Sequence, residues 1–394
     1  MKKTIILVAF MLISLAGICD KFVWNAKANY PSFPRHRVSG LSIGNRGYMG
    51  MGHVNSGSIS LAYHDWWEYE PSTDSWSQKA DYPLDRFAVV GFTIGNKGYM
   101  GSGNEQSFGD RAEFFEYDPI TNVWTAKANF PNPAGGNTSF AINGLGYMGF
   151  GNGVGLYSYN PILNAWTFVP TPIGPSDYSS SFVIGNKAYI LPSFSSTFYE
   201  FNPVTGVTTT KAPFIGDARY AAVSFAVRNQ GYIGLGFSSV TGGCVKDFYF
   251  YNPTLDVWDT IPKAFPGVRR NYVPSFVIGD NAFFGTGSNG TNLGDVWAYE
   301  WKISVGVNEY YKNNDIGIFP NPTSDFLNFK IANTNSNSPL TFKLFSLTGK
   351  EIFTNEINQS YLSCNVSSVA EGIYIATIFD SNQNLLFSKQ LIIN

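Results

Sequence analysis

The chain has 394 residues, of which 16% are aromatic and 14% are charged, with 40 glycines and a formal net charge of −2 at pH 7. The nearly balanced charge gives no reason to expect nucleic acid or an anionic membrane surface as a partner, since both attract basic proteins. Abundant glycine and aromatic residues are typical of an all-β repeat protein, and the length allows a large domain followed by a small one.

Residues 1–19 have the pattern of a secretory signal peptide. Two lysines follow the first residue, and an apolar segment over residues 5–16 is too short to span a bilayer as a stable helix. Cleavage after Ala16 and cleavage after Cys19 both fit the sequence. A lipoprotein signal is the alternative, although Ile18 stands where that signal has a small residue. We therefore expect an exported protein that has no membrane-spanning segment once the signal is removed.

Residues 20–302 repeat one sequence pattern with a period of about 40–50 residues. Each copy contains four short runs of apolar and aromatic residues separated by Gly, Asn and Pro. In residues 91–131 examples of these runs are GFTI, GYMGSG, FFEYD and VWTAKA. Such runs predict antiparallel β-strands joined in hairpins. The copies begin at Gly40, Gly91, Ser139, Ser181, Ser224 and Ser275.

The third turn of each copy has a fixed residue order. An acidic or amide residue precedes a proline, whose ring fixes φ for a tight turn. Three residues after the proline comes a residue type that tolerates a positive φ: Asp74, Asn122, Asn164, Gly206 or Asp256. Two residues further on, the outermost run holds Trp76, Trp124, Trp166, Thr208 or Trp258. We interpret these tryptophans as structural residues that fill the gap between neighbouring sheets.

This pattern resembles the kelch-type β-propellers. The shared features are a hydrophobic strand, a glycine-ended strand with an aromatic residue, and a Tyr-Asp/Asn-Pro turn followed by Trp. The usual double glycine is replaced here by Gly-x-Gly, and the fourth copy loses this motif at Leu191-Pro192. The resemblance implies an all-β, six-bladed β-propeller in which each copy forms one four-stranded blade.

The two ends of the repeat region complete each other. The sixth copy, from Ser275 through Tyr299, has no Trp turn, whereas residues 23–31 nearly duplicate residues 123–131. We expect the N-terminal strand to supply the outer strand of the last blade, because this pairing covers sheet edges that would otherwise be exposed. The predicted domain over residues 20–302 is therefore a six-bladed kelch-like propeller closed by its N-terminal strand.

Two further segments follow the repeats. Residues 303–316 are polar and free of the repeat, which indicates a linker. Residues 317–394 alternate apolar and polar residues between breaks at Gly349 and Gly372, which predicts a small antiparallel β-sandwich. These residues resemble the C-terminal sorting domains of the type IX secretion system of Bacteroidetes, with four matching motifs in order: Pro320-Asn321-Pro322, Leu347-Thr348-Gly349-Lys350, Glu371-Gly372-Ile373-Tyr374 and Lys389-Gln390-Leu391-Ile392.

The sorting-domain resemblance bears on partners and location. It implies that the type IX secretion machinery is a partner and that the protein crosses the outer membrane, usually with removal of this tail. Release and anchoring at the cell surface both remain open. We expect a secreted protein, either extracellular or on the outer-membrane surface. An adhesive sandwich domain that stays attached is the alternative for residues 317–394.

The sequence offers few residues for catalysis or metal binding. The three histidines are His36, His53 and His64, and Asp65 lies near enough in sequence to join two of them on a metal, although such trios are usually surface groups. If Cys19 leaves with the signal, one cysteine remains in each predicted domain, so no disulfide framework is indicated. No nucleophile or nucleotide-binding motif is present. We predict no catalytic residue, no metal and no cofactor.

One set of cations recurs at a fixed register. Counting nine residues back from the end of each innermost run reaches an arginine in copies one, two, five and six, but Ala134 and Ser176 in the others. In a closed ring these four blades are consecutive, so the guanidiniums would form an arc beside the channel mouth, where they suit carboxylate or sulfate groups. The alternative is that each pairs with an acid of the adjacent blade, or with turn carbonyls, and locks the ring. The predicted ligand-binding residues are Arg35, Arg86, Arg219 and Arg270.

The leading functional hypothesis is a secreted or cell-surface binding module that recognises an acidic glycan or a protein at the propeller mouth. The alternative, suggested by the kelch resemblance, is a sugar-acid mutarotase or epimerase. That chemistry needs an acid or base beside the arginines; Glu105, Asp110 and Asp217 lie in loops but follow no fixed pattern. A buried acidic side chain within hydrogen-bond reach of two of the arginines would favour the enzyme. A scaffold for surface assembly would leave no mark in the sequence.

Overall fold

The computed structural model describes residues 19–56, 59–304, 310–311, 316–331, 340–347, 349–359, 361–381 and 385–394. The predicted signal peptide lies outside these residues, apart from Cys19. The described chain divides into two compact units, one over Phe22–Trp301 and one formed mainly by Lys302–Asn394. Apart from a 3-10 turn at Gly151–Gly153 (η1), the regular elements of the described residues are β-strands. None of the described segments forms a helix long and apolar enough to cross a membrane.

Six four-stranded sheets make up most of the larger unit, and the strand pairs described in them are antiparallel. From the innermost to the outermost strand, the first three sheets are β2 (Ser39–Ile43), β3 (Arg46–Gly50), β6 (Trp66–Glu70) and β7 (Ser75–Gln78); β8 (Val90–Ile94), β9 (Lys97–Gly101), β10 (Phe114–Asp118) and β11 (Val123–Ala126); and β12 (Thr138–Ile142), β13 (Leu145–Gly149), β14 (Leu156–Asn160) and β15 (Ala165–Val169).

The other three sheets follow the same plan. They are β16 (Ser180–Ile184), β17 (Lys187–Leu191), β18 (Phe198–Asn202) and β19 (Val207–Lys211); β21 (Val223–Val227), β22 (Gln230–Gly234), β25 (Phe248–Asn252) and β26 (Val257–Thr260); and β27 (Ser275–Ile278), β28 (Asn281–Gly285), β29 (Val296–Ser304) and β1 (Cys19–Lys27). Two small sheets lie in connecting loops: β4 (His53–Ser56) with β5 (Ile59–Ala62), and β20 (Arg219–Tyr220) with β23 (Phe237–Ser238) and β24 (Gly243–Cys244).

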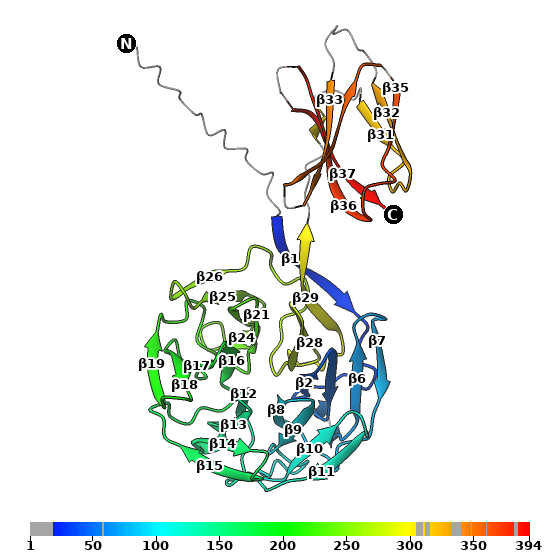
Figure 1. Ribbon diagram of the computed structural model, residues 1–394. Helices are drawn as coiled ribbons and strands as arrows, with labels where there is room; N and C mark the ends of the chain where they lie inside the picture. The colour runs from blue at the N-terminus through cyan, green and yellow to red at the C-terminus, as the bar shows by residue number, and fades with distance from the viewer. Residues whose placement is uncertain are drawn as a thin grey trace, which may run out of the picture. The chain divides into compact units, whose positions relative to one another are not determined.

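The six sheets surround a common centre (Figure 1). Each innermost strand contacts the innermost strands of two other sheets in the order β2, β8, β12, β16, β21, β27, and β27 contacts β2. The blue strand β1 lies beside the yellow strand β29 at the outer edge of the sixth sheet, so the N-terminal segment shares a sheet with the last copy of the repeat. This all-β arrangement is consistent with a β-propeller.

In four of the six sheets, the third turn of the repeat joins the sheet to the segment before it. In the second sheet, Asn122 has a φ of 56°, and its Oδ1 accepts hydrogen bonds from the Tyr117 hydroxyl and the Ala80 backbone N–H, both at 2.9 Å. The indole of Trp124 donates to the Ala80 carbonyl at 2.9 Å. The same bonds occur around Asp74, Asn164 and Asp256. The tryptophans of these turns therefore have the structural role that the sequence predicts.

Neighbouring sheets approach closely where a phenylalanine of one innermost strand lies on a glycine of the next sheet. A Cβ at Gly146 would be 2.0 Å from the ring of Phe92, so only a hydrogen atom fits there. The same contact occurs at two other junctions: Phe182 on Gly231 and Phe276 on Gly47. Because Phe276 belongs to the sixth sheet and Gly47 to the first, this packing also joins the last sheet to the first.

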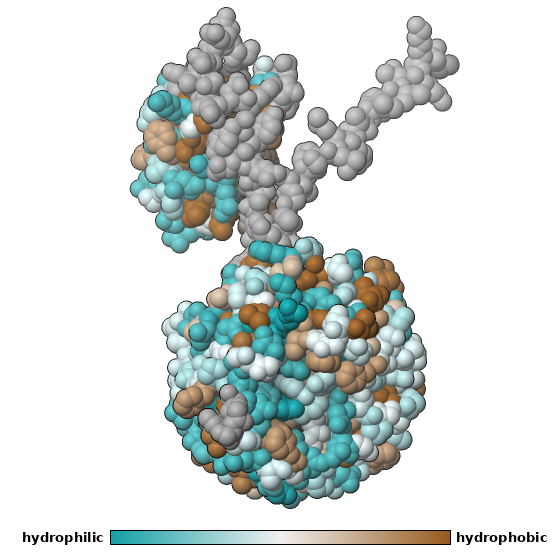
Figure 2. Space-filling model, turned by 180° about the vertical axis from the view of Figure 1, so that it is seen from behind, coloured by the Kyte–Doolittle hydropathy of each residue, from teal (hydrophilic) through white to brown (hydrophobic). Residues whose placement is uncertain are grey.

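On the face shown in Figure 2, hydrophobic residues occur in small groups between hydrophilic ones over the larger unit. This mixture is ordinary for a protein surface, since the large aromatic side chains of the repeat are buried between the sheets. Among the most deeply buried are Trp66, Tyr69, Tyr117, Tyr159 and Tyr251.

The smaller unit contains two antiparallel sheets. One has the order β30 (Tyr310–Tyr311), β37 (Leu385–Ile393), β36 (Gly372–Phe379), β33 (Leu340–Ser346) and β34 (Glu351–Ile357), and the other has the order β31 (Ile316–Phe319), β32 (Phe326–Ile331) and β35 (Tyr361–Asn365). Leu327, Phe329 and Phe342 contribute to one buried core. Since β29 runs to Ser304 and β30 pairs with β37, strands occupy part of the range predicted to be a linker.

Candidate functional site

A cavity of about 490 Å³ follows the innermost strands at the centre of the larger unit. Three serines at equivalent places in its wall donate their hydroxyls to a backbone carbonyl of the preceding sheet: Ser139 to Gly91 (2.7 Å), Ser224 to Ser181 (2.8 Å) and Ser275 to Ser224 (2.9 Å). The hydroxyl of the fourth, Ser181, lies 2.8 Å from Thr138 Oγ1 and 3.5 Å from the Ser139 carbonyl, both in the preceding sheet. These bonds commit the hydroxyl protons to contacts between sheets, so this part of the wall is a fixed surface rather than a set of free donors.

The four predicted arginines are buried where the chain enters its sheets, with exposed fractions of 0% for Arg35, 7% for Arg86, 2% for Arg219 and 0% for Arg270. Each guanidinium contacts a carboxylate that immediately precedes the third strand of the same sheet. Three of the contacts are bidentate: Arg35 to Asp65 (2.8 and 2.6 Å), Arg219 to Asp247 (2.7 and 3.0 Å) and Arg270 to Asp295 (2.7 and 2.7 Å). Arg86 contacts Glu113 at 3.2 Å.

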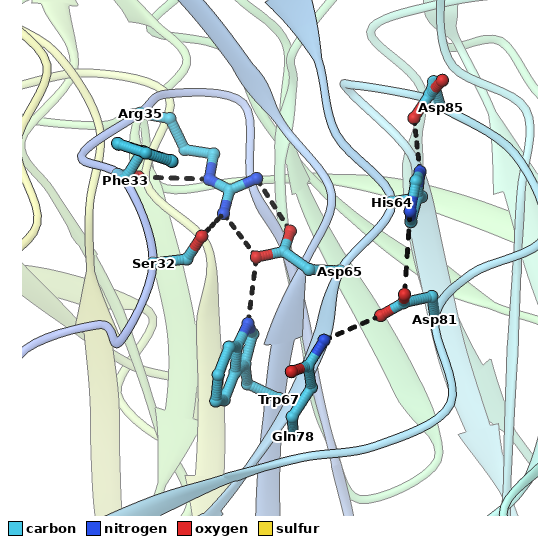
Figure 3. A network of polar contacts seen from close by, with 9 residues as sticks. All are labelled: Ser32, Phe33, Arg35, His64, Asp65, Trp67, Gln78, Asp81 and Asp85. Atoms are coloured by element: carbon cyan, nitrogen blue, oxygen red, sulfur yellow. Dashed lines mark hydrogen bonds and ion pairs between the residues drawn. The ribbon is translucent and has the colours of Figure 1, made fainter.

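Figure 3 shows how fully Arg35 is engaged. Besides its two bonds to Asp65, it donates through Nη2 to Ser32 Oγ at 2.5 Å and through Nε to the Phe33 carbonyl at 3.2 Å. Asp65 also accepts a hydrogen bond from the Trp67 indole at 2.9 Å. These contacts hold Arg35 as part of the framework.

The carboxylates of these pairs are held in their charged form. Burial by itself raises the pKa of Asp247, but the hydrogen bond and charge of Arg219 outweigh it and hold this pKa below its usual value. Burial and Arg270 act in the same opposed way on the pKa of Asp295, with the same result. Both ion pairs are therefore intact at neutral pH.

Each of the six sheets has either both the buried arginine and its partner acid or neither of them. In the third sheet the two positions hold Ala134 and Gly155, and in the fourth they hold Ser176 and Thr197. The arginine backbone also links sheets, since the Gly287 N–H donates to the Arg35 carbonyl at 2.9 Å. This geometry favours the ring-locking alternative, with the partner acid in the same sheet rather than the adjacent one. Ligand binding by Arg35, Arg86, Arg219 and Arg270 stays a prediction.

The contacts of these acids also bear on the choice between binding and catalysis. Among the described residues, each of the four carboxylates contacts one of the four arginines, and none bridges two of them. The arrangement expected for the enzyme, an acid within reach of two of these arginines, is therefore not seen at these positions.

The histidine trio considered from sequence is not assembled. Asp65 bonds to Arg35 and Trp67, whereas His64 lies beside Asp85, with its Nδ1 2.5 Å from that carboxylate (Figure 3). His53 instead lies next to His36, with ring centres 5.3 Å apart. In the described part of the chain, no group of three or more His, Cys, Asp or Glu residues is arranged to hold a metal ion.

The entrance of the cavity is a ring with one residue from each sheet, located two positions after the arginine register. All six residues line the cavity and have a positive φ: Arg37 (55°), Ala88 (53°), Gly136 (68°), Tyr178 (55°), Ala221 (51°) and Tyr272 (56°). Backbone hydrogen bonds connect neighbours in this ring, as from Tyr178 N–H to the Gly136 carbonyl at 2.6 Å and from Tyr272 N–H to the Ala221 carbonyl at 3.0 Å. Arginine and tyrosine rarely adopt this backbone conformation, and such strain is concentrated at functional sites.

Arg37 is the cation of this entrance ring. Its guanidinium carbon lies 4.0 Å from the centre of the Tyr272 ring, and its Nε donates to the Tyr178 hydroxyl at 3.1 Å. Its Nη1 is 2.6 Å from His36 Nε2. Arg37 is half-buried, and no described carboxylate forms an ion pair with it. It is therefore available to an anionic ligand, unlike the four buried arginines.

Two histidines beside Arg37 are neutral at pH 7. Burial, followed by the charge of Arg37, lowers the pKa of His36 to about 4 and that of His53 to about 4. His36 Nε2 thus accepts from Arg37, while its Nδ1–H donates to Asn292 Oδ1 at 2.9 Å. The positive charge of this group of residues is concentrated on one guanidinium.

Sequence reasoning overlooked Arg37, Tyr178 and Tyr272. The same register count, moved by two residues, would have reached them, because it passes through Ala88, Gly136 and Ala221 in the other copies. The signal available in the sequence was that this position holds a large polar side chain in three copies and a small residue in the other three.

Two comparisons with known proteins found a match: a family model and a solved structure. Residues 317–394 match the family model of the secretion system C-terminal sorting domain. A solved structure titled "Structure of YjhT" is similar with 15% sequence identity and a TM-score of 0.56, over 68% of this chain and 96% of that chain. At this identity the likeness concerns the fold alone. No curated protein matches the chain. The sorting domain marks the protein as one that the type IX secretion system exports to the outside or the surface of the cell.

Proposed function

We propose that the larger unit is a closed six-bladed kelch-type propeller that binds an acidic glycan or a protein at its channel mouth. The ring of contacts among innermost strands, which returns from β27 to β2, supports the closed form. The pairing of β1 with β29 supports closure by the N-terminal strand. The repeated Tyr–Asp/Asn–Trp turn contacts support kelch-type blades.

The observation that carries the binding proposal is the Arg37 guanidinium, which forms no ion pair with a carboxylate of the described residues and lies among tyrosines at the end of a 490 Å³ cavity. A guanidinium half removed from water attracts a carboxylate or sulfate more strongly than an exposed one does. The neighbouring aromatic rings offer apolar contact area with polar edges. The four buried arginines act beneath the mouth by fixing the loops that carry the entrance ring.

The proposal is tested with an array of acidic and neutral oligosaccharides and acidic peptides, probed with the secreted protein. The Arg37→Ala variant should lose at least about tenfold in affinity for the acidic probes, the equivalent of one strong charged contact. Binding should also weaken as salt rises.

Arg46→Ala is the matched control, because Arg46 is a partly exposed arginine of the same sheet that pairs with Glu70 on strand β6. It should bind like the wild type. Equal binding by wild type and Arg37→Ala, or no binding of any probe by the wild type, would overturn the proposal.

A further inference from the structure

A second pocket, of about 480 Å³, adjoins the entrance ring. Its lining includes Ser176, Asp177, Ser193, Phe194 and Tyr220. Tyr178 lines both this side pocket and the central cavity, and its hydroxyl accepts from Arg37. The side pocket and the Arg37 guanidinium are therefore separated by one side chain.

The side pocket lies where the fourth copy departs from the repeat. Ser176 occupies the register that holds the buried arginine in four other sheets, and Thr197 occupies the place of its acid. At the corresponding place in the third sheet, Ala134 is fully buried, and the neighbouring Gly135 N–H donates to Asp110 Oδ1 at 2.7 Å. The fourth sheet, which lacks the ion pair, thus has an open pocket beside it, and Gly153 of the third sheet's loop also lines that pocket.

The wall of the side pocket is aromatic and partly uncovered. Phe194 is 52% exposed, has a φ of 56°, and lies with its ring centre 4.9 Å from that of Tyr220 at an angle of 48°. It stands in the segment that replaces the Gly-x-Gly motif of the other copies. A left-handed conformation is costly for a large aromatic residue, and about half of Phe194 stays exposed beside Tyr220.

Polar groups border these rings. The Ser176 hydroxyl oxygen accepts from the Ser193 N–H at 2.8 Å, and the Ser193 hydroxyl donates to the Asp177 carbonyl at 2.5 Å. The exposed Asp177 carboxylate accepts a hydrogen bond from the Asn152 N–H. Asp177 Oδ2 has no hydrogen-bond partner among the described residues. Apolar ring faces beside hydroxyl and carboxylate acceptors match a sugar ring, whose C–H face packs on an aromatic ring while its hydroxyls donate at the edge.

We propose that the side pocket is a saccharide subsite next to an anion subsite at Arg37, so that the ligand is an acidic oligosaccharide of at least two sugar units. This inference rests on the proposed binding function and names its ligand class. The negatively charged sugar contacts Arg37, and the adjacent sugar stacks on Phe194 and Tyr220.

Two variants remove the subsite in different ways. Phe194→Ala removes one stacking face. Ser176→Arg combined with Thr197→Asp introduces the ion pair of the other sheets and narrows the pocket, and thermal unfolding verifies that this variant folds. Phe168→Ala is the matched control, because Phe168 is 57% exposed on β15. If the double variant fails to fold, Phe194→Ala decides the test.

The probes are uronic acid monosaccharides and uronic-acid-containing di- and trisaccharides, titrated by calorimetry, together with an acidic peptide array. Both pocket variants should lower affinity for the di- and trisaccharides about tenfold or more and leave the monosaccharide nearly unchanged, whereas Arg37→Ala should weaken both. Unchanged oligosaccharide binding in the pocket variants overturns the subsite and leaves the proposed function standing. Binding of acidic peptides without binding of any saccharide also overturns the subsite and leaves the proposed function standing. If the protein binds neither saccharides nor peptides, the subsite and the proposed function are both overturned.

Discussion

Arg35, Arg219 and Arg270 lie in the same place in three sheets, and each has a fully or almost fully buried guanidinium with a bidentate carboxylate. Arg37, two positions along the chain from the first of them, has no such partner among the described residues. Arg35, which is buried in an ion pair, and Arg37, which has no described carboxylate partner, are thus only two positions apart in the sequence. The proposed binding function therefore depends on which guanidinium keeps free hydrogen-bond donors.

The ring-locking role of the buried pairs predicts a loss of stability without a loss of affinity. Arg270→Ala leaves the Asp295 carboxylate without its partner, so the free energy of unfolding should fall by about 3 kcal/mol, at the low end for a buried pair because the Asp295 side chain is 34% exposed. Chemical denaturation measures this change. Arg270→Met with Asp295→Leu should recover much of the loss. Weaker binding at unchanged stability would instead support the ligand-binding role predicted for Arg270.

The neutral histidines predict a dependence of stability on pH. Because folding lowers the pKa of His36 to about 4 and of His53 to about 4, the unfolded chain binds more protons between about pH 6.5 and 4. Stability should therefore decrease as pH falls through this window. Urea unfolding at pH 7 and pH 4.5 should give a smaller decrease for a His36→Gln, His53→Gln variant than for the wild type. Identical decreases would contradict this assignment.

At the scale of elements, β1 and the third turns act as connectors between sheets. Trp24 of β1 is 7% exposed and donates to the Lys263 carbonyl at 2.8 Å, as the tryptophans of the turns donate to alanine carbonyls. Asn25 donates to Glu300 of β29 at 2.6 Å. The N-terminal segment therefore uses the same contacts between sheets as the internal outer strands.

Deleting residues 20–31 should destabilise the larger unit far more than shortening a surface loop. The deletion removes an outer strand and the buried Trp24, and loss of such a ring alone costs about 3–5 kcal/mol. Removal of residues 239–242, in the loop before β24, is the control. The thermal unfolding midpoint should fall for the first variant and stay near wild type for the second. An unchanged midpoint after the first deletion would rule out closure by the N-terminal strand.

In the protein as a whole, the sorting domain and the proposed binding site belong to different units. Residues 317–394 match the sorting domain, whereas the central cavity and the side pocket are lined by residues of Phe22–Trp301. Each unit has a hydrophobic core of its own, and cores of this kind let domains fold separately.

Removing residues 303–394 should therefore abolish secretion and leave saccharide binding intact. In cells with a type IX system, the shortened protein should be retained inside the outer membrane while the full chain reaches the medium or the surface. Calorimetric titration of the shortened protein should give the affinity of the full chain. A loss of affinity would mean that the second unit contributes to the site.

The strand pattern, the turns and the sorting domain follow from the sequence by itself. Each depends on the properties of residues that are close together in the sequence. Examples are Asn122, which tolerates a positive φ, and Gly146, which leaves room for a neighbouring ring. The candidate site is different. Arg37 meets Tyr178 across 141 residues of chain, and Arg270 finds Asp295 only once β27, β28 and β29 form one sheet. Which arginine is buried and which is available can be learned only from the folded chain, because burial and pairing depend on segments that the fold brings together.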